Sequence, residues 1–287
     1  MSVEMVYWDV QHGSATYIKT PNNTHIVQDL GTGSYGRDDK EFSPLLHLRN
    51  KWDVRQLDNV TITHPHKDHI SDIMNFDVLS PRSLDRPKHL TRDEIMQDVR
   101  EEDKPIFEKY LEIHERYSTP ISSEENPRLP QNNGGVEIEV FTPRSCSASN
   151  LNNHSKVTVI SYADIKVILP GDNEPPSWKE LLGMSRFTKA IKDADILLAP
   201  HHGRDSGFCP ELFDHFNPKL TVISDGRFCD TSATDRYGKV STGWTVYHRG
   251  NKPKEKRRCV TTRSDGVIVI KLGYDSAKER FIKVTVD

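Results

Sequence analysis

Residues 61 to 72 read T-I-T-H-P-H-K-D-H-I-S-D, and this stretch decides the fold. The run from 59 to 63 that leads into it is rich in β-branched residues and predicts a short strand. Four side chains of the kinds that bind metal ions follow at once: His64, His66, Asp68 and His69. Imidazoles and carboxylates are ligands that zinc and similar metals prefer. The sequence therefore predicts a strand that ends in metal ligands.

The spacing of these groups indicates two ions. Side chains two residues apart on an extended chain point to the same side, so His64 and His66 can share one ion. Asp68 and His69 follow where the strand should turn into a helix, and they can reach a second ion. The alternative is a polar loop that begins a helix, and groups further along the chain weigh against it.

Those later groups lie where other predicted strands begin or end. Asp172 closes the run 169–172 after an apolar strand, and its carboxylate can bridge two metals, although such a residue alone is more often part of a turn. His154 precedes a strand and is either a ligand or a hydrogen-bonded turn histidine. The pair His201-His202 follows the strand at 195–198. One sheet edge can gather all of these groups.

The rest of the chain predicts an α/β fold. We expect strands near 4–10, 15–18, 25–27, 136–141, 156–160, 165–169, 195–198, 220–223, 267–270 and 281–284, and helices near 41–52, 175–192 and 209–216. Strands come first, helices intervene, and the pattern recurs in two halves. This order predicts an αββα arrangement, in which two mixed β-sheets pack as a sandwich with outer helices. We expect one domain over residues 1–287.

Residues 76–132 differ from this pattern and predict a helical insertion within the domain. Thr91 followed by Glu94 forms a capping box, and Pro105 is expected to begin a second helix. The segment 118–135 is polar and rich in Pro, Asn and Gly, so it predicts a loop. The insertion is either a lid over the site or an interaction surface, and the sequence favours neither.

Composition narrows the class of protein. The 39 Lys and Arg residues nearly balance the 42 Asp and Glu residues, so the net charge of −3 gives no strong overall field. We see no signal peptide and no apolar run long enough to cross a membrane, and we expect a cytoplasmic protein that does not bind membranes. No C-x-x-C pattern occurs, and we expect reduced thiols at Cys146, Cys209, Cys229 and Cys259.

The pattern His-x-His-x-Asp-His, then a distant His, a Gly-Asp and a last His, resembles that of the metallo-β-lactamase-fold hydrolases. Within this group the chain is similar to the soluble domain of ComEC, the family of bacterial DNA-uptake channels. The closer resemblance is carried by Asp9-Val10-Gln11-His12-Gly13-Ser14-Ala15, Asp29-Leu30-Gly31, Asn152-Asn153-His154-Ser155, Leu169-Pro170-Gly171-Asp172, His201-His202-Gly203, Ile223-Ser224 and Thr262-Arg263-Ser264-Asp265-Gly266. It spans nearly the whole chain outside residues 76–132.

The resemblance implies a centre of two divalent ions, with Zn²⁺ expected and Mn²⁺ as the alternative. The first ion would be held by His64, His66 and His154, and the second by Asp68, His69 and His201. Asp172 would bridge the two ions, and Asp29 would orient a ligand histidine. His202 is left open, because it would either replace His201 as a ligand or donate a proton near the leaving group.

Three positions depart from the family pattern. Members of the ComEC type often lack a histidine at the position of His154, so its presence indicates a complete first site. Ser14 replaces an aspartate of the opening motif. Arg204 follows His-His-Gly where serine is usual, and its guanidinium would meet a phosphate bidentately or pair with Asp205 or Asp172.

The chemistry expected of such a centre is hydrolysis. Two ions about 3.5–4 Å apart lower the pKa of a water held between them and yield hydroxide near neutral pH. Asp68 and His202 are the expected catalytic side chains. The resemblance favours a phosphodiesterase or nuclease that acts on nucleic acid or a nucleotide. The alternatives are a hydrolase of small esters or lactones, and a metal-stabilised module without turnover in a defence or DNA-handling assembly.

A basic run near the C-terminus bears on the substrate. Five of the seven residues 252–258 are Lys or Arg, so they are candidates for phosphate contacts, above all Lys254, Lys256, Arg257 and Arg258. The alternative is a solvated hairpin tip. A basic rim from the insertion would be added by Arg82, Arg86, Lys88 and His89.

Overall fold

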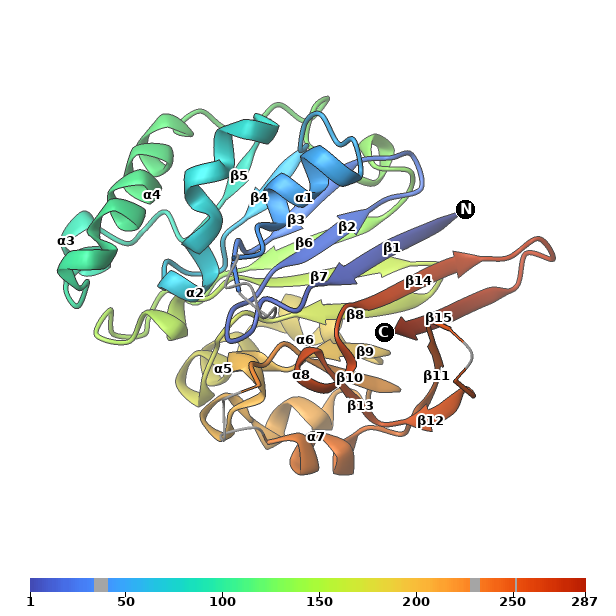
Figure 1. Cartoon of the computed structure of the whole chain (residues 1–287). Helices are drawn as coiled ribbons and strands as arrows, with labels where there is room; N and C mark the ends of the chain where they lie inside the picture. The colour runs from blue at the N-terminus through green and yellow to red at the C-terminus, as the bar shows by residue number, and fades with distance from the viewer. Residues whose placement is uncertain (34–40, 228–232, 251) are drawn as a thin grey trace.

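The computed structural model describes residues 1–33, 41–227, 233–250 and 252–287. Within these residues two β-sheets pack face to face, and helices cover the outer face of each sheet (Figure 1). The predicted αββα class with two mixed sheets is therefore confirmed. Cys229 lies outside the described residues, whereas the three other cysteines are free thiols, as expected.

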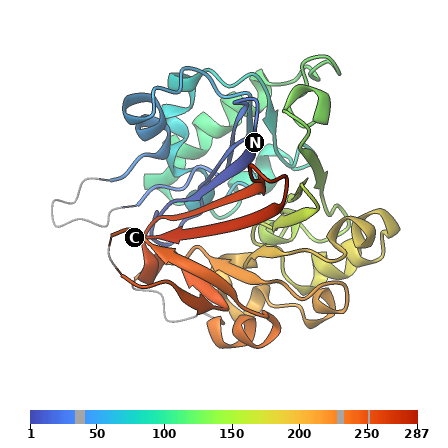
Figure 2. The ribbon, with the colours of Figure 1, turned by 90° about the vertical axis from the view of Figure 1, so that its right-hand side faces the viewer.

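The first sheet contains nine strands in the described part of the chain, in the order β12-β11-β15-β14-β1-β2-β3-β4-β5. Its strands are β1 (Ser2–Tyr7), β2 (Thr16–Lys19), β3 (His25–Gln28), β4 (Asn59–Thr61), β5 (Leu84–Asp85), β11 (Trp244–His248), β12 (Glu255–Arg257), β14 (Ile268–Tyr274) and β15 (Arg280–Val286). Most neighbours are antiparallel, but β3, β4 and β5 run parallel to one another and β11 runs parallel to β15. The hairpin β14–β15 lies beside β1, so the two ends of the chain share one sheet (Figure 2).

The second sheet has the order β13-β10-β9-β8-β7-β6. Its strands are β6 (Glu137–Phe141), β7 (Val157–Tyr162), β8 (Ile165–Leu169), β9 (Ile196–Leu198), β10 (Leu220–Ile223) and β13 (Cys259–Thr261). The strands β8, β9, β10 and β13 run parallel, so their carboxyl ends meet at one edge. The segments that follow β8, β9 and β10 carry Asp172, His202 and Ser224 to this edge.

The outer helices each bury one face. Those over the first sheet are α1 (Pro44–Lys51), α2 (Lys67–Ile70), α3 (Arg92–Met96) and α4 (Lys104–Arg116), and those over the second are α5 (Pro175–Leu182), α6 (Ser185–Ile191) and α7 (Thr234–Val240). A short helix, α8 (Thr262–Asp265), follows β13. An apolar cluster of side chains from both sheets fills the space between them, and two further clusters lie under the helices. Buried apolar area of this extent is the main source of stability for such a sandwich.

Several element predictions need correction. The segment 76–132 contains α3 with its capping box and α4 with Pro105 in its first turn, but it also contributes β5 to the first sheet, so it is not wholly helical. The helix expected over 175–192 is broken into α5 and α6, and the one at 209–216 is a 3-10 helix at 210–214. The sequence did not predict β11, β12 or β13. Strands β12 and β13 are only three residues long, and β12 consists of Glu-Lys-Arg.

In the described part of the chain, no helix is both long enough and apolar enough to span a membrane. The cytoplasmic location expected from the sequence stays a prediction, as do the single domain and the boundaries of the insertion.

Candidate metal centre

Four side chains converge where β4, β8 and β9 end. The ligand atoms of Asp68, His69, Asp172 and His202 all lie within 4.8 Å of one another. Nε2 of His69 is 3.2 Å from Oδ1 of Asp172, and Nε2 of His202 is 3.2 Å from Oδ2 of Asp68 and 3.3 Å from Oδ2 of Asp172. Two carboxylates and two imidazoles at this separation form a donor set suited to a divalent transition metal.

The orientation of His69 is fixed by a buried carboxylate. Nδ1 of His69 donates to Oδ2 of Asp29 at 2.9 Å, which leaves Nε2 pointing at Asp172. Asp29 is itself held by the backbone N–H of Thr63, 2.7 Å from its Oδ1, and it is fully buried. A carboxylate behind an imidazole selects the tautomer that offers Nε2 to a metal. Asp29 thus makes the contact that the predicted orienting role requires.

His202 is held in a similar way by backbone atoms. Its Nδ1 donates to the carbonyl of Ser224 at 3.0 Å, so Nε2 is the free ligand atom. Both His201 and His202 adopt left-handed backbone conformations, with φ of 50° and 54°. Non-glycine residues rarely take this conformation, and such strain is concentrated at functional sites.

A glycine lets Asp172 approach the cluster. Gly171 has φ of +61°, and a Cβ there would lie 2.8 Å from the Cβ atoms of both Ser155 and Thr63. The hydroxyl of Ser155 accepts the backbone N–H of Asp172 at 3.0 Å. The run Leu-Pro-Gly-Asp thus places the carboxylate against the end of β4, and any larger residue at 171 would push the two segments apart.

The charges of the cluster favour a bound cation. Burial alone would raise the pKa of Asp68 and Asp172, but His69 and His202 outweigh it and hold both carboxyl pKa values well below their usual range. Burial would lower the pKa of His202, yet Asp172 and Asp68 raise it to about 10. Without a cation, the imidazoles must carry protons to balance the buried carboxylates. A divalent ion supplies the same balance with neutral imidazoles, so these residues fit a metal.

His64 and His66 form a second group beside the first. Nε2 of His64 faces Nδ1 of His66 at 2.9 Å and lies 4.0 Å from Oδ2 of Asp172. His154 is not one of the residues that converge on Asp172. Its Nδ1 faces Nε2 of His89 at 2.9 Å, and its Nε2 is buried without a hydrogen-bond partner in the described structure. A buried nitrogen left without a donor or acceptor is what an absent ligand contact would leave behind.

His201 lies outside the compact cluster. Its Nδ1 is 3.2 Å from Oε1 of Glu174 and 2.8 Å from the hydroxyl of Ser206, and its Nε2 is 4.0 Å from Oδ2 of Asp172. His202 reaches both Asp68 and Asp172 at hydrogen-bond distance. The geometry therefore favours His202 over His201 as the ligand, which is the first of the two options that the sequence left open for His202.

A cleft of about 700 Å³ opens above the cluster. Arg204 and His12 line it together with Asp68 and Asp172. The guanidinium of Arg204 donates to Nε2 of His12 at 2.9 Å, and its Nε is buried without a partner in the described structure. Arg204 thus points into the cleft with a donor to spare, and it pairs with His12 instead of the two aspartates considered from sequence.

Sequence reasoning missed His12. Its Nε2 lies 3.8 Å from Oδ2 of Asp68, and its ring centre is 4.9 Å from that of His202. The signal was available, because His12 stands in the segment 9–15 that carries the family resemblance. Burial lowers the pKa of His12, as do His202 and Arg204, so the neutral imidazole is favoured.

The structure does not bring the basic run 252–258 to this centre. Part of the run forms β12, the outermost strand of the first sheet, which lies far from α2 in Figure 1. Arg257 makes two contacts of 3.0 Å with the carboxylate of Asp265, and Arg258 donates to the carbonyl of Gly238. Lys254 lies over the ring of Tyr247. These contacts support the alternative interpretation, a solvated hairpin tip.

Comparison with known proteins agrees with the motifs. No family model matches the chain. ComE operon protein 3 of Bacillus subtilis (strain 168) is 23% identical over 239 residues, which cover 78% of this chain and 28% of that protein. This chain resembles ComE operon protein 3. The resemblance to the ComEC family inferred from the sequence is therefore confirmed, although the chain spans only about a quarter of that relative's length.

Two further matches are more distant. The uncharacterized protein YcaI of Escherichia coli (strain K12) is 29% identical over 94 residues, covering 33% of this chain and 12% of that protein. Among solved structures, the short form of human tRNase Z (ELAC1) aligns with a TM-score of 0.44 and 11% identity, over 78% of this chain and 93% of that chain.

Proposed function

We propose that the protein is a hydrolase that uses two divalent metal ions to cleave phosphodiester bonds in nucleic acid or nucleotides. The observation that carries this proposal is the convergence of Asp68, His69, Asp172 and His202 within 4.8 Å, where strands of the two sheets end. Structural buried ion pairs seldom combine two carboxylates with two imidazoles whose other nitrogens are anchored behind them. The similarity to ComE operon protein 3 supports the choice of substrate class.

The ligands would divide into two groups that share Asp172. Asp68, His69 and His202 would hold one ion, and His64 and His66, with His154 as a third ligand, would hold the other. Zn²⁺ suits this nitrogen and oxygen donor set, and Mn²⁺ is the alternative. When bound, such a pair of ions activates water and stabilises charge on the attacked centre and the leaving oxygen.

Arg204 and His12 would act on the substrate from the cleft. Arg204 lines the cleft, and a guanidinium matches phosphate geometry better than an ammonium does. The neutral imidazole of His12 accepts from Arg204 at Nε2, so its ring proton is on Nδ1. Because we propose His202 as a ligand, the role of proton donor considered for it would pass to His12, whose side chain is 43% exposed.

The proposal is tested by metal content and cleavage together. The purified chain, supplied with zinc or manganese, should bind two ions and cleave bis(p-nitrophenyl) phosphate and single- or double-stranded DNA or RNA. The double variant His64→Ala, His66→Ala should lose cleavage, whereas His47→Ala, His215→Ala, which removes two histidines outside the centre, should keep it. If the chain binds two ions but acts only on esters or lactones, the proposed phosphodiesterase is wrong and the protein is a small-molecule hydrolase. Two bound ions with no activity on any of these substrates would indicate a non-catalytic module.

A further inference from the structure

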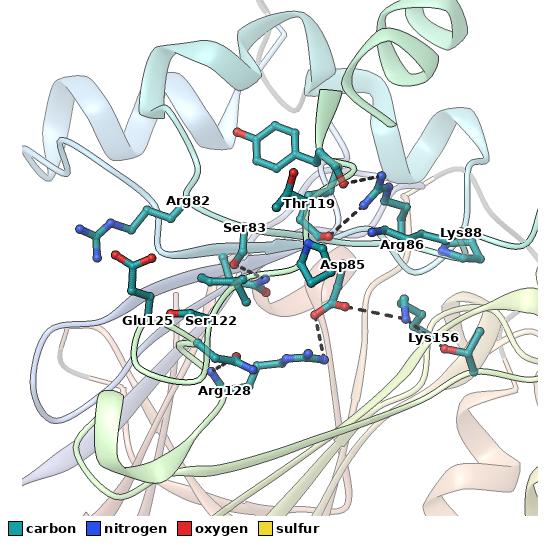
Figure 3. A pocket seen from close by; sticks show the side chains of 18 of the residues that line it. Arg82, Ser83, Asp85, Arg86, Lys88, Thr119, Ser122, Glu125, Arg128 and Lys156 are labelled. Carbon is teal, nitrogen blue, oxygen red and sulfur yellow. Dashed lines mark hydrogen bonds and ion pairs between the residues drawn. The ribbon is translucent and has the colours of Figure 1, made fainter. Parts of the chain in front are cut away.

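A second cavity, of about 730 Å³, lies beside β5 and is drawn in Figure 3. Its walls come from β5 and the segment after it, from the loop at 117–128, and from the start of β7. Ligand sites commonly have volumes of about 300–1,000 Å³, so the cavity is large enough for a small phosphorylated molecule or a few nucleotides of a strand.

The cavity concentrates positive charge. Six cationic side chains line it, against the two carboxylates of Asp85 and Glu125: Arg82, Arg86, Lys88, Arg128, Arg144 and Lys156. The whole chain carries a net charge of −3, so this excess is local and is not a consequence of composition. Concave surfaces lined by one sign of charge focus the field and attract ligands of the opposite sign.

One buried carboxylate serves two of these cations. Arg128 approaches Oδ2 of Asp85 at 3.0 Å and Lys156 approaches Oδ1 at 3.9 Å, from two sides (Figure 3). Lys156 is only 9% exposed, and its ammonium also donates to the hydroxyl of Thr142 at 3.0 Å. A buried ammonium that shares its counter-ion at a long distance is incompletely compensated.

Four cations remain, and one of them, Arg82, pairs with Asp58 at 3.8 Å. Arg86 is buried and donates to the carbonyls of Leu84, His114 and Tyr117, so it contributes charge while its donors are already used. Lys88 and Arg144 have exposed side chains, and no carboxylate pairs with them in the described structure. These two and Lys156 therefore hold donors that a ligand can take.

We propose that this cavity binds a phosphate group of a phosphate ester, carried by a nucleotide or by a nucleic-acid strand. Arginine and lysine together supply a fork of donors and a point charge, the combination that phosphate oxygens favour. Hydroxyls of Ser83, Ser122 and Thr142 line the same cavity and add neutral donors. The terminal phosphate of a nucleotide presents three free oxygens to these donors, one more than a carboxylate, whereas the phosphodiester of a strand presents two.

The cavity adjoins the metal centre through two contacts. His89 lines the cavity, and its Nε2 is 2.9 Å from Nδ1 of His154. The backbone N–H of Lys156 donates to the carbonyl of Thr63, the residue before the first ligand, at 3.0 Å. A phosphate bound in this cavity would therefore be part of the substrate of the metal centre. That assignment rests on the proposed function, whereas the binding of a phosphate in the cavity does not.

The test measures the binding of two fluorescent single-stranded oligonucleotides. One has ordinary phosphodiester linkages, and the other has a neutral methylphosphonate at every linkage. Inorganic phosphate and a nucleoside triphosphate are used as competitors. The variant Lys88→Gln, Arg144→Gln should bind the phosphodiester strand at least tenfold more weakly, because it removes two charge-assisted contacts. Its dependence on salt should also be shallower by about one power per lost contact. The matched variant Lys189→Gln, Lys192→Gln removes the same charge from exposed positions on and beside α6 and should bind as the natural chain does.

A second variant, Lys156→Met, keeps the buried volume and should weaken binding about tenfold, with thermal unfolding used to show that it remains folded. Competition by the nucleoside triphosphate alone would identify a nucleotide site, and preference for the strand would identify a nucleic-acid site. Equal affinity of all variants, or equal binding of the methylphosphonate strand, would overturn the proposal. If the protein cleaves no substrate but the cavity variants bind the strand more weakly, the proposed hydrolase activity is wrong and the proposed phosphate site stands.

Discussion

The two halves of the candidate metal centre differ in how the chain holds their imidazoles. In one half, His69 and His202 each give their Nδ1 to a fixed acceptor and turn Nε2 towards Asp172. In the other, His64 faces His66 nitrogen to nitrogen, and a third histidine, His154, faces His89. Both halves contain a contact between imidazole nitrogens, since Nε2 of His69 faces Nε2 of His202 at 3.2 Å. Only in the first half are both Nδ1 atoms held by a carboxylate or carbonyl oxygen, so that half is the better preorganised. We expect the first half to bind its metal more tightly.

The largest effect should come from the residue that both halves share. Asp172→Asn should reduce phosphodiester cleavage by about three orders of magnitude, more than the roughly 10–100-fold typical of residues behind the ligands, because both ions lose a charged ligand. Metal analysis should show less than one tightly bound ion per chain. Retention of two ions with only a small loss of activity would show that Asp172 does not connect the halves.

The choice between two neighbouring histidines comes next. His202→Ala should lose the ion of the preorganised half and most of the activity, because its Nε2 lies within 3.3 Å of both aspartates. His201→Ala should keep that ion, since Nε2 of His201 is 4.0 Å from Oδ2 of Asp172 and His201 lies outside the compact cluster. Metal titration of the two variants side by side measures this. The reverse ranking would return His201 to the ligand position expected from the family pattern.

A smaller effect is expected behind the ligands. Asp29→Asn keeps the shape of the side chain but weakens the hold on Nδ1 of His69, so affinity for one ion should fall by about 10–100-fold while the other ion stays bound. The readout is a competition titration with a chelator that resolves two binding steps. Equal weakening of both steps would mean that Asp29 supports the fold around the centre and not one ligand in particular.

Most of this site was accessible from sequence, for a physical reason. Metal ligands must converge, and parallel strands with a common carboxyl edge deliver them, so the runs after 59–63, 165–169 and 195–198 stood out. The sequence did not show which charged side chains lie close together. The basic run 252–258 is contiguous in sequence, yet Arg257 is held by Asp265. Lys156 and Arg144 are scattered, yet the fold gathers them around one cavity.

The choice between His201 and His202 could not be made from sequence, because both follow the same strand. It depends on which side chain turns towards Asp172, and this is decided by the left-handed backbone and the carbonyl of Ser224. His12 was missed because its partner, Arg204, is 192 residues away along the chain. Contacts of that range are properties of the packed sheets and leave no local pattern.

Two nearby carboxylates, Asp68 and Asp72, show a similar difference in how the chain holds a buried group. Asp68 faces imidazoles and its pKa is held low, whereas Asp72, four residues later, meets only neutral donors. Burial raises the pKa of Asp72 to about 6, and the hydrogen bonds from Asn75, Leu45 and Ser43 offset this only in part. Neutral donors therefore do less than imidazoles to offset the burial of a carboxylate.

This difference predicts the smallest effect, a pH dependence of stability. Because the folded pKa of Asp72 lies above its unfolded value of 3.8, the folded state binds more protons, and the contribution of Asp72 to stability falls as pH rises from about 4 to 6. Asp72→Asn does not titrate, so its stability relative to the natural chain should improve over that range, by up to roughly 3 kcal/mol. Denaturant unfolding at pH 4.5 and 7.5 measures the change.

The matched control is Asp77→Asn on the same 3-10 helix. Burial would raise the pKa of Asp77, but hydrogen bonds from Arg116 and Lys109 lower it, so its ionised form stabilises the fold. Its stability relative to the natural chain should therefore worsen as pH rises towards about 4, opposite in sign to Asp72→Asn and at lower pH, so this variant is also measured at pH 3. If both variants changed in the same direction, the pH dependence would arise elsewhere in the protein, and the contrast between carboxylates paired with cations and those held by neutral donors would not hold.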